Sequence, residues 1–191
     1  QPRFCLNTTW NSIATTFTNQ SFVSTQPRSI FVNSNNSIYI LNRETGEIHI
    51  WLNENHPNPT KTIEGNLRYP FSLFVTTNGD IYVDNEHLGR VDKWIVENET
   101  WISVMNVTSP CFGLFIDIYE NLYCSSHDNH RVDKQWSNGT TITVAGSELN
   151  TLNHPWGIFV DINLDLYVAD SGNNRIQLFR LNQRNGITVA G

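Results

Sequence analysis

One pattern recurs four times along the 191-residue chain. Phenylalanines stand at positions 31, 74, 115 and 159, so the steps between them are 43, 41 and 44 residues. An Ile or Leu follows seven residues after each of them, and a tyrosine comes next, at Tyr39, Tyr82, Tyr123 and Tyr167. A large aromatic residue then ends the third apolar run of each copy, at Trp51, Trp94, Trp136 and Phe179. Because four features stay in phase over four copies, the chain is built from one repeated unit.

The last copy indicates what this unit is. Its runs of β-branched and aromatic residues are 158–160, 166–168, 176–179 and 187–189, and turn-forming Asn, Asp, Gly or Ser separates them. Such runs predict consecutive strands joined by hairpins, and no stretch of ten residues has the apolar period of a helix. Four strands in about 40–45 residues are typical of propeller blades. The predicted fold is therefore all-β, a β-propeller of four-stranded antiparallel blades.

Several motifs of the last copy resemble the NHL repeat, which is named for an Asn-His-Leu signature. They are Pro155-Trp156-Gly157-Ile158, Val160-Asp161, Leu166-Tyr167-Val168-Ala169-Asp170, Asn173-Asn174-Arg175-Ile176 and Thr188-Val189-Ala190-Gly191. The resemblance covers residues from about 26 to 191. It is weakest in the first copy, where Asn42 and Glu47 replace Asp170 and Arg175. It implies a β-propeller, most often one with six blades.

The whole chain, 1–191, reads as one domain, with blades at about 26–65, 69–104, 109–146 and 153–191. Residues 1–25 do not make a full repeat. Trp10 resembles the aromatic residue that ends a third strand, and Thr15-Thr16-Phe17 resembles a fourth strand. We expect these residues to form an outer half-blade, with a loose tail as the alternative.

The chain starts with Gln1 and not with Met, so we interpret it as part of a longer protein. In that case the four blades and the half-blade form an open arc, and the domain is incomplete. A six-bladed ring then needs the rest of the parent chain, on the order of 65 more residues at about 43 per blade. We expect the exposed blade faces of the arc to promote association.

Charge and hydropathy limit the partners. The net charge is −6 and the pI is near 5.4, with no basic stripe, so nucleic acid is not expected as a partner. No apolar run approaches the roughly 18 residues of a membrane-spanning helix, so no span is expected in this segment.

Sequons for N-glycosylation, Asn-x-Ser/Thr, begin at Asn7, Asn19, Asn35, Asn98, Asn106 and Asn138. Six are a mild excess over what the Asn, Ser and Thr content gives by chance. Because such acceptors matter only in secreted proteins, they favour an extracellular or lumenal location. A cytoplasmic location is the alternative.

Cys111 and Cys124 are 13 residues apart and flank one predicted hairpin. In a regular ladder Cys111 falls opposite His127, three residues from Cys124, which is too far for a disulfide. A bent start of the strand closes that gap. We keep two alternatives, a disulfide and a pair of buried thiols.

Asp170 and Arg175 bracket a tight turn, and Arg90 and Arg131 are the counterparts of Arg175 in copies two and three. A carboxylate at this place accepts from the backbone of the turn, and a guanidinium bridges to it or to the next blade. These four residues are candidate ligand contacts on one face of the propeller. The alternative is that they only hold the scaffold together.

His127 and His130 form a His-x-x-His motif with Asp128 beside them, which makes them weak candidates for zinc ligands. In register with the last copy, however, they belong to a surface turn, where Ser171 and Asn174 stand. Metal ligands need fixed geometry and a supporting shell. We therefore expect no bound metal and no cofactor.

The NHL family includes a lyase that makes amidated peptides with a histidine-bound metal in the propeller channel. Such a site needs histidines that converge from different blades, and His49, His56, His87 and His154 stand at non-equivalent positions. No nucleophile–His–acid set stands out either.

Our leading interpretation is therefore a non-enzymatic scaffold that binds a protein, peptide or glycan through the loops of one face. A metal-dependent lyase of the amidating type is the alternative. RNA binding, which NHL propellers with positive faces carry out, is the third interpretation.

Overall fold

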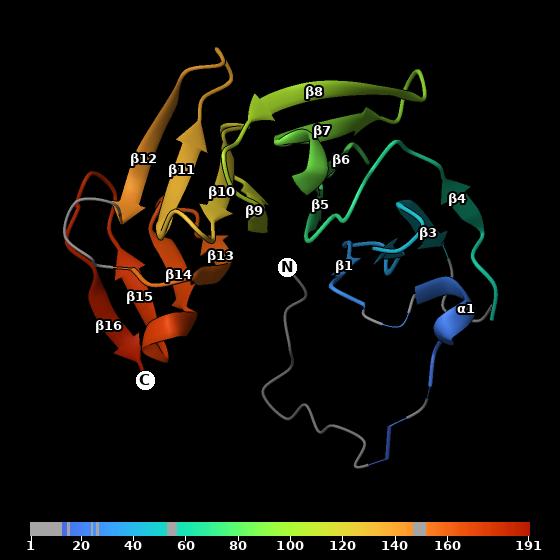
Figure 1. Ribbon diagram of the computed structural model, residues 1–191, viewed down its shortest axis with the longest axis horizontal. Helices are drawn as coiled ribbons and strands as arrows, with labels where there is room; N and C mark the ends of the chain where they lie inside the picture. The colour runs from blue at the N-terminus through green and yellow to red at the C-terminus, as the bar shows by residue number, and fades with distance from the viewer. Residues whose placement is uncertain (1–12, 15, 24, 26, 53–56, 147–151) are drawn as a thin grey trace.

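The computed structural model describes residues 13–14, 16–23, 25, 27–52, 57–146 and 152–191. Within them, sixteen strands form four antiparallel sheets, and each strand pairs with its neighbours in sequence (Figure 1). Blade one holds β1 (Ser29–Val32), β2 (Ile38–Asn42), β3 (Glu47–Trp51) and β4 (Lys61–Ile63); blade two holds β5 (Leu73–Val75), β6 (Ile81–Asn85), β7 (Arg90–Ile95) and β8 (Thr100–Asn106). Blade three holds β9 (Cys111–Ile116), β10 (Leu122–Ser126), β11 (Arg131–Gln135) and β12 (Thr141–Gly146); blade four holds β13 (Pro155–Val160), β14 (Leu166–Asp170), β15 (Arg175–Phe179) and β16 (Ile187–Ala190). The predicted all-β fold of four-stranded blades is confirmed.

The phenylalanines and tyrosines that mark the repeat face each other across the first hairpin of every blade. The pairs are Phe31 with Tyr39, Phe74 with Tyr82, Phe115 with Tyr123, and Phe159 with Tyr167. Equivalent residues of the four copies therefore occupy equivalent sites, as the spacing predicts.

The rings of the four marker phenylalanines form a continuous row along the first strands of the blades. Their centroids are 5.2 Å apart for Phe31 and Phe74, 5.1 Å for Phe74 and Phe115, and 5.3 Å for Phe115 and Phe159. The repeat pattern predicts that these four phenylalanines are buried, and this is wrong, because each of them keeps part of its surface exposed. The first strand is the inner edge of its sheet and has no further strand beside it.

The apolar cores lie between blades rather than inside them. One cluster of buried side chains joins blades one and two and includes Ile48 and Val83. A second joins blades two and three through Val91 and Leu114, and a third joins blades three and four. Each sheet is thus stabilised by apolar contact with the next one, which is the nearest-neighbour packing of repeat proteins.

Consecutive blades follow one another around an arc, with blades one and four at its two ends (Figure 1). The first strands are in contact along it, β1 with β5, β5 with β9, and β9 with β13. Both end blades expose apolar side chains. Ile30 and Val32 of β1 are 64% and 53% exposed, and Ile187 and Val189 of β16 are 49% exposed.

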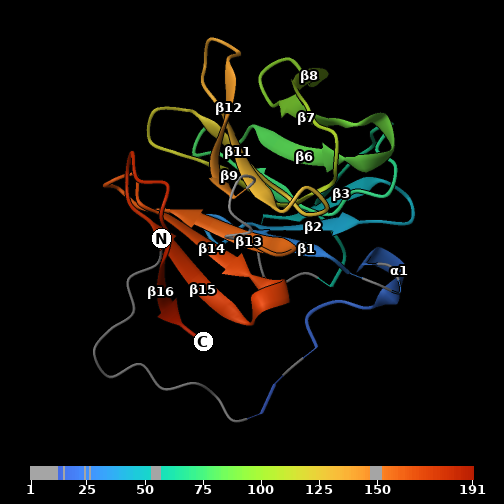
Figure 2. The same cartoon turned by 60° about the vertical axis from the view of Figure 1, so that its left-hand side comes forward.

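The N-terminal segment predicted to form a fourth strand does not form one in the residues that the structure describes. Thr16 and Phe17 lie outside any strand, and Gln20–Val23 form the short helix α1 beside blade one (Figure 2). Phe17 sets its ring against Trp51 of β3, with centroids 5.4 Å apart. Ring packing on the end of blade one thus takes the place of strand pairing. Trp10, the other part of the predicted half-blade, lies outside the described residues.

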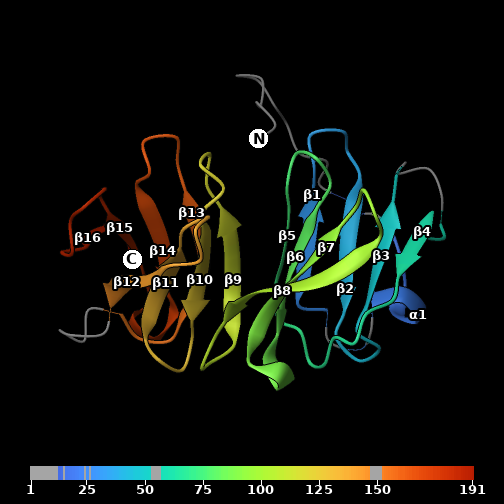
Figure 3. The ribbon, with the colours of Figure 1, turned by 90° about the horizontal axis from the view of Figure 1, so that it is seen from above.

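The up-and-down strand order gives every blade two ends. At the end we call the lower face, the second strand turns into the third, and the chain passes to the next blade. The helix α1 and the 3₁₀ turns η1 (Glu86–Leu88) and η2 (Ser171–Asn173) lie at this end, in the lower half of Figure 3. At the opposite end, the upper face, the first strand turns into the second and the third into the fourth.

Phe115 touches a neighbouring ring on each side, so it tests the importance of the row. We expect Phe115→Ala to lower the free energy of unfolding by about 2–4 kcal/mol, at or just below the range for a fully buried phenylalanine. Chemical denaturation measures this beside Ile118→Ala, a control in the β9–β10 turn that is 63% exposed. Equal midpoints for the two variants would contradict the role given to the row.

Candidate functional site

A strip of aromatic side chains crosses the lower face of three neighbouring blades. Phe71, Phe112 and Trp156 each stand three residues before the marker phenylalanine of their blade, and Arg28 holds that position in blade one. Phe71 and Phe112 stack with centroids 4.1 Å apart, and Trp156 meets Phe112 edge-on at 5.1 Å. The guanidinium carbon of Arg28 lies 5.6 Å from the centre of the Phe71 ring. We call these four residues the aromatic strip.

Three histidines widen the strip in blades three and four. The ring of His127 stacks on Phe112 at 4.0 Å. His154 lies 4.8 Å from His127 and 4.4 Å from His130, measured between ring centroids. The backbone N–H of His154 donates to Nδ1 of His130 at 3.0 Å, so this nitrogen is an acceptor and the bond ties the two blades together.

His130 has a backbone conformation that the other blades give to glycine or asparagine. Its φ is 55°, and the equivalent residues Gly46, Gly89 and Asn174 have φ of 73°, 60° and 52°. Histidine tolerates this left-handed region better than most residues but less well than glycine. The turn alone therefore does not favour histidine over glycine. The contacts with His154 give a physical reason for its presence.

A second arginine meets the strip at its blade-one end. The guanidinium carbon of Arg43 lies 4.5 Å from the centre of the Phe71 ring and 5.4 Å from that of Tyr69. It also forms a long ion pair with Glu86, at 3.7 Å. Tyr69 is 58% exposed and Trp156 is 42% exposed, so both ends of this surface reach solvent. A chain with net charge −6 thus gathers guanidinium and imidazole groups on one face.

The arginines expected as ligand contacts lie on the same face, each at the start of a third strand. Their ion pairs join Arg90 with Asp92, Arg131 with Asp133 and Arg175 with Asp170, at 2.7, 2.9 and 2.7 Å. Asp170 is fully buried and also accepts from the backbone N–H of Asn153, at 2.6 Å. Each guanidinium is therefore paired with a carboxylate of its own blade, which favours the scaffold interpretation. A role in ligand binding stays a prediction.

The two candidate zinc ligands have other partners. Nδ1 of His127 is 2.7 Å from a carboxylate oxygen of Asp128, and Nδ1 of His130 accepts from His154. In the described part of the chain, no three His, Cys, Asp or Glu side chains are placed to hold a metal ion. The arrangement offers ring faces, ring edges and hydrogen-bonding nitrogens to a ligand.

Sequence reasoning missed both the strip and the meeting of the histidines. The signal for the strip was present, since the position three residues before each marker phenylalanine is aromatic in three copies. The histidines gave no such signal. His127, His130 and His154 hold unrelated repeat positions, and only the adjacency of the lower-face loops of two blades brings them together. His56 lies outside the described residues.

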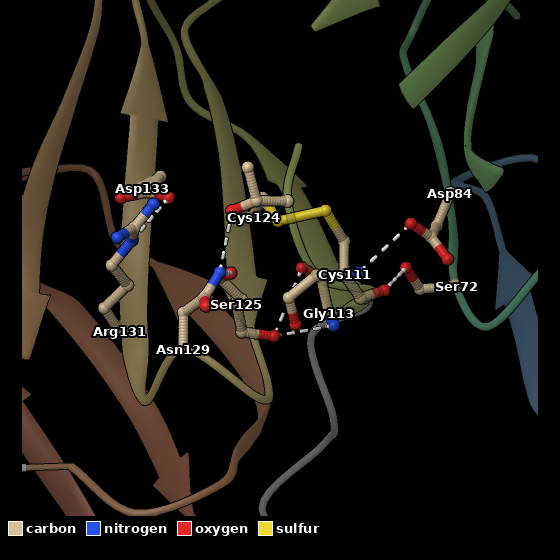
Figure 4. Close-up of a disulfide and its surroundings, with 12 residues drawn as sticks. Ser72, Asp84, Cys111, Gly113, Cys124, Ser125, Asn129, Arg131 and Asp133 are labelled. Atoms are coloured by element: carbon tan, nitrogen blue, oxygen red, sulfur yellow. Dashed lines mark hydrogen bonds and ion pairs between the residues drawn. A yellow bond between two sulfur atoms is a disulfide. The ribbon is translucent and has the colours of Figure 1, made fainter. Parts of the chain in front are cut away.

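Cys111 and Cys124 form a disulfide, with an S–S distance of 2.06 Å and Cα atoms 5.2 Å apart (Figure 4). Of the two alternatives, the structure therefore has the disulfide. The strands keep the expected register as far as Leu114 opposite Cys124, and then an irregularity places Cys111 opposite Ser126. The predicted pairing with His127 is wrong, because the start of β9 is displaced toward Cys124.

Gly113 and Ser125 explain the displaced start of β9. The backbone N–H of Gly113 donates to the hydroxyl of Ser125 at 2.7 Å, in place of a ladder bond (Figure 4). The same hydroxyl donates to the carbonyl of Trp156 in blade four. A Cβ on Gly113 would lie 2.7 Å from that carbonyl oxygen, so the next blade packs at a distance that only glycine allows.

Cys111 also ties blade three to blade two. Its N–H donates to Oδ1 of Asp84 at 3.0 Å, and its carbonyl accepts from the hydroxyl of Ser72 at 2.6 Å (Figure 4). Asp84 is fully buried, and Oδ2 has no hydrogen-bond partner in the described part of the chain. Burial raises the pKa of Asp84 from 3.8 to about 7, although the N–H groups of Cys111 and Phe71 partly offset this.

A family comparison identifies the repeat. Residues 152–179 match the model of the NHL repeat, a stretch that runs from just before β13 to the end of β15. The last blade thus carries a match to the NHL repeat, in a chain that folds as a β-propeller. By sequence, no curated protein matches it.

Solved structures share the fold of this propeller at low sequence identity. A streptogramin B lyase superposes with a TM-score of 0.72 at 14% identity, over 90% of this chain and 56% of the other. A catalytically inactive virginiamycin B lyase from Staphylococcus aureus with quinupristin gives 0.68 at 11%, over 86% and 55%. A structure of a nidogen/laminin complex gives 0.72 at 17%, over 86% and 65%. The propeller thus spans less than two thirds of each of these chains.

The buried Asp84 predicts a pH-dependent stability. Between about pH 4 and 7 its carboxyl keeps a proton in the folded protein and loses it in the unfolded one. Its contribution to the free energy of unfolding therefore falls as pH rises, by up to about 1.4 kcal/mol per pH unit. Asp84→Asn stays neutral and still accepts from Cys111, so we expect it to remove this slope and to be more stable than the wild type at pH 7.5.

Denaturation of both proteins from pH 4.5 to 8 measures the difference. The control is Asp170→Asn, which removes a buried carboxylate paired with Arg175 and should lower stability at pH 7.5. Parallel pH profiles for Asp84→Asn and the wild type would contradict the prediction.

Proposed function

We propose that this propeller is a non-enzymatic binding module whose lower face holds a peptide segment of a protein partner. The observation that supports this is the aromatic strip, whose rings touch one another from blade two to blade four, with arginines at the blade-one end. Because the position of the strip is in phase with the repeat, one ligand can contact equivalent side chains of successive blades.

The chemistry of the strip suits a protein partner. Aromatic residues and arginine are enriched at protein interfaces, and Trp, Tyr and Arg are prominent among the few residues that carry most of the binding energy. Exposed Tyr69 and Trp156 offer an apolar body with a polar group. A propeller of similar fold was solved in a nidogen/laminin complex, which gives a precedent for this class of partner.

A lyase activity is the second candidate, because His127, His130 and His154 meet beside the strip and two similar structures are lyases. The first of these histidines is engaged by a carboxylate and the second by a backbone N–H, which favours a structural role for them. Chromatography of quinupristin after incubation with the protein tests this candidate. Turnover of quinupristin that is lost in His154→Ala would replace the binding proposal by an enzymatic one.

RNA is a weaker fit. Single-stranded RNA also stacks on aromatic rings, but its affinity depends on neutralising phosphates, and this chain has a net charge of −6. Among the described residues, no helix is long and apolar enough to cross a membrane.

Replacing strip residues should weaken peptide binding. A random peptide library displayed on phage is selected on the wild-type chain, and the enriched peptides are then measured against the variant Phe112→Ala/Trp156→Ala. We expect the affinity to fall at least about tenfold, because truncation of central aromatic residues costs more than about 1.4 kcal/mol at such interfaces.

The matched control changes two exposed apolar residues of the upper face. Ile118→Ala/Tyr119→Ala should keep the affinity of the wild type, since these residues are 63% and 64% exposed in the β9–β10 turn. No enriched peptide, or peptides that bind both double variants as well as the wild type, would refute the proposal. Binding of a glycan array or of polyuridine in place of peptides would refute the peptide assignment.

A further inference from the structure

The sequons differ in how the fold presents them. Five of the six acceptor asparagines lie in described residues, and all five are exposed. Two of them, Asn98 and Asn138, occupy the same kind of turn in neighbouring blades, between the third and fourth strands. Both turns lie at the upper face, opposite the aromatic strip.

The turn of blade three is an open hairpin tip. Gly139 donates its N–H to the carbonyl of Trp136, and Trp136 donates to the carbonyl of Thr140, each at 2.9 Å. The side-chain oxygen of Asn138 accepts from the N–H of Thr140, also at 2.9 Å. Residues 137–140 are all exposed, and a Cβ on Gly139 would meet nothing within 4 Å. The side-chain amide nitrogen of Asn138 thus has room for a bulky substituent.

The turn of blade two, which contains Asn98, is also exposed. The hydroxyl of Thr100 donates to the side-chain oxygen of Asn98 at 2.6 Å, which brings together the two residues that define the sequon. Glu99 between them pairs with Lys61 of blade one at 2.6 Å, on the outer surface. Residues 96–100 are exposed throughout.

Two other sequons are held more tightly. Ser37 of the sequon at Asn35 is 6% exposed and lies inside the β1–β2 turn. Asn106 is the last residue of β8 and pairs with Arg90, and the hydroxyl of Thr108 in its sequon accepts from Asn129. An enzyme that must contact both the asparagine and the hydroxyl residue reaches these sites less readily than the open turns.

We propose that Asn98 and Asn138 are N-glycosylation sites and that their glycans cover the upper face of blades two and three. The disulfide between Cys111 and Cys124 fits the same oxidising, secretory compartment. In the modification, the amide nitrogen bonds to the anomeric carbon of a sugar whose bond to a lipid-linked diphosphate donor breaks, and the amide loses one proton. The glycans would leave the lower face open, and this inference does not depend on what that face binds.

Site mapping on the wild-type chain tests the proposal directly. The protein is secreted from cultured animal cells behind a cleavable leader, and its glycans are removed by peptide N-glycosidase in heavy-oxygen water. Mass spectrometry of the peptides should show labelled aspartate at positions 98 and 138. Absence of the label from both positions, or label only at other sequons, would overturn the proposal.

Variants provide an independent control on each site. Thr100→Ala and Thr140→Ala should each remove one glycan from the intact mass, whereas Thr100→Ser and Thr140→Ser keep the sequon and should keep the glycan. Loss of the glycan in the serine variants as well, or its retention in the alanine variants, would count against the assigned acceptors.

Discussion

The row of phenylalanine rings along the first strands is the contact on which the arrangement of the blades depends. Each ring touches the next at 5.1–5.3 Å, and the three buried clusters lie at the three junctions beside them. A blade of this kind has no core of its own, so its stability comes from its neighbours. The same logic explains why Ile30 and Val32 of β1, in an end blade, are exposed, whereas the equivalent Leu73 and Val75 of β5 are buried.

Polar groups adjust the junctions that the rings set up. In blade two, the buried carboxyl group of Asp84 accepts from the N–H of Cys111 in blade three. At the next junction, the residue equivalent to Cys111 is Pro155, which has no backbone N–H. The residue equivalent to Asp84 is Ser125, and its hydroxyl donates to the carbonyl of Trp156 instead. The same position in the repeat thus holds a hydrogen-bond acceptor in blade two and a donor in blade three, and each bonds to the backbone of the next blade. At each of these two junctions, a buried side chain is thus hydrogen-bonded to a backbone group of the next blade.

The sequence predicts the parts of the fold that repeat. The period, the four strands of each blade, the hairpin turns and the Phe–Tyr register all follow from features in phase over four copies. The features that the sequence does not predict occur in only one copy of the repeat. The disulfide of Cys111 and Cys124 needs the irregularity near Gly113, which the sequence permits as one alternative but does not select. The segment containing Phe17 packs its ring on Trp51 instead of adding a strand, because burying a ring there competes with pairing at the sheet edge.

The candidate site combines both kinds of information. Its rings, Phe71, Phe112 and Trp156, are in phase with the repeat, yet they lie at the ends of the blades, where apolar residues are not needed to fill a junction. Apolar side chains kept at a solvent-facing position suggest a partner that covers them. The histidines are out of phase and belong to blades three and four alone. A ligand that contacts only the rings could bind at several positions along the strip, because equivalent rings repeat from blade to blade. The histidine cluster, which occurs only in blades three and four, would restrict the ligand to one of these positions.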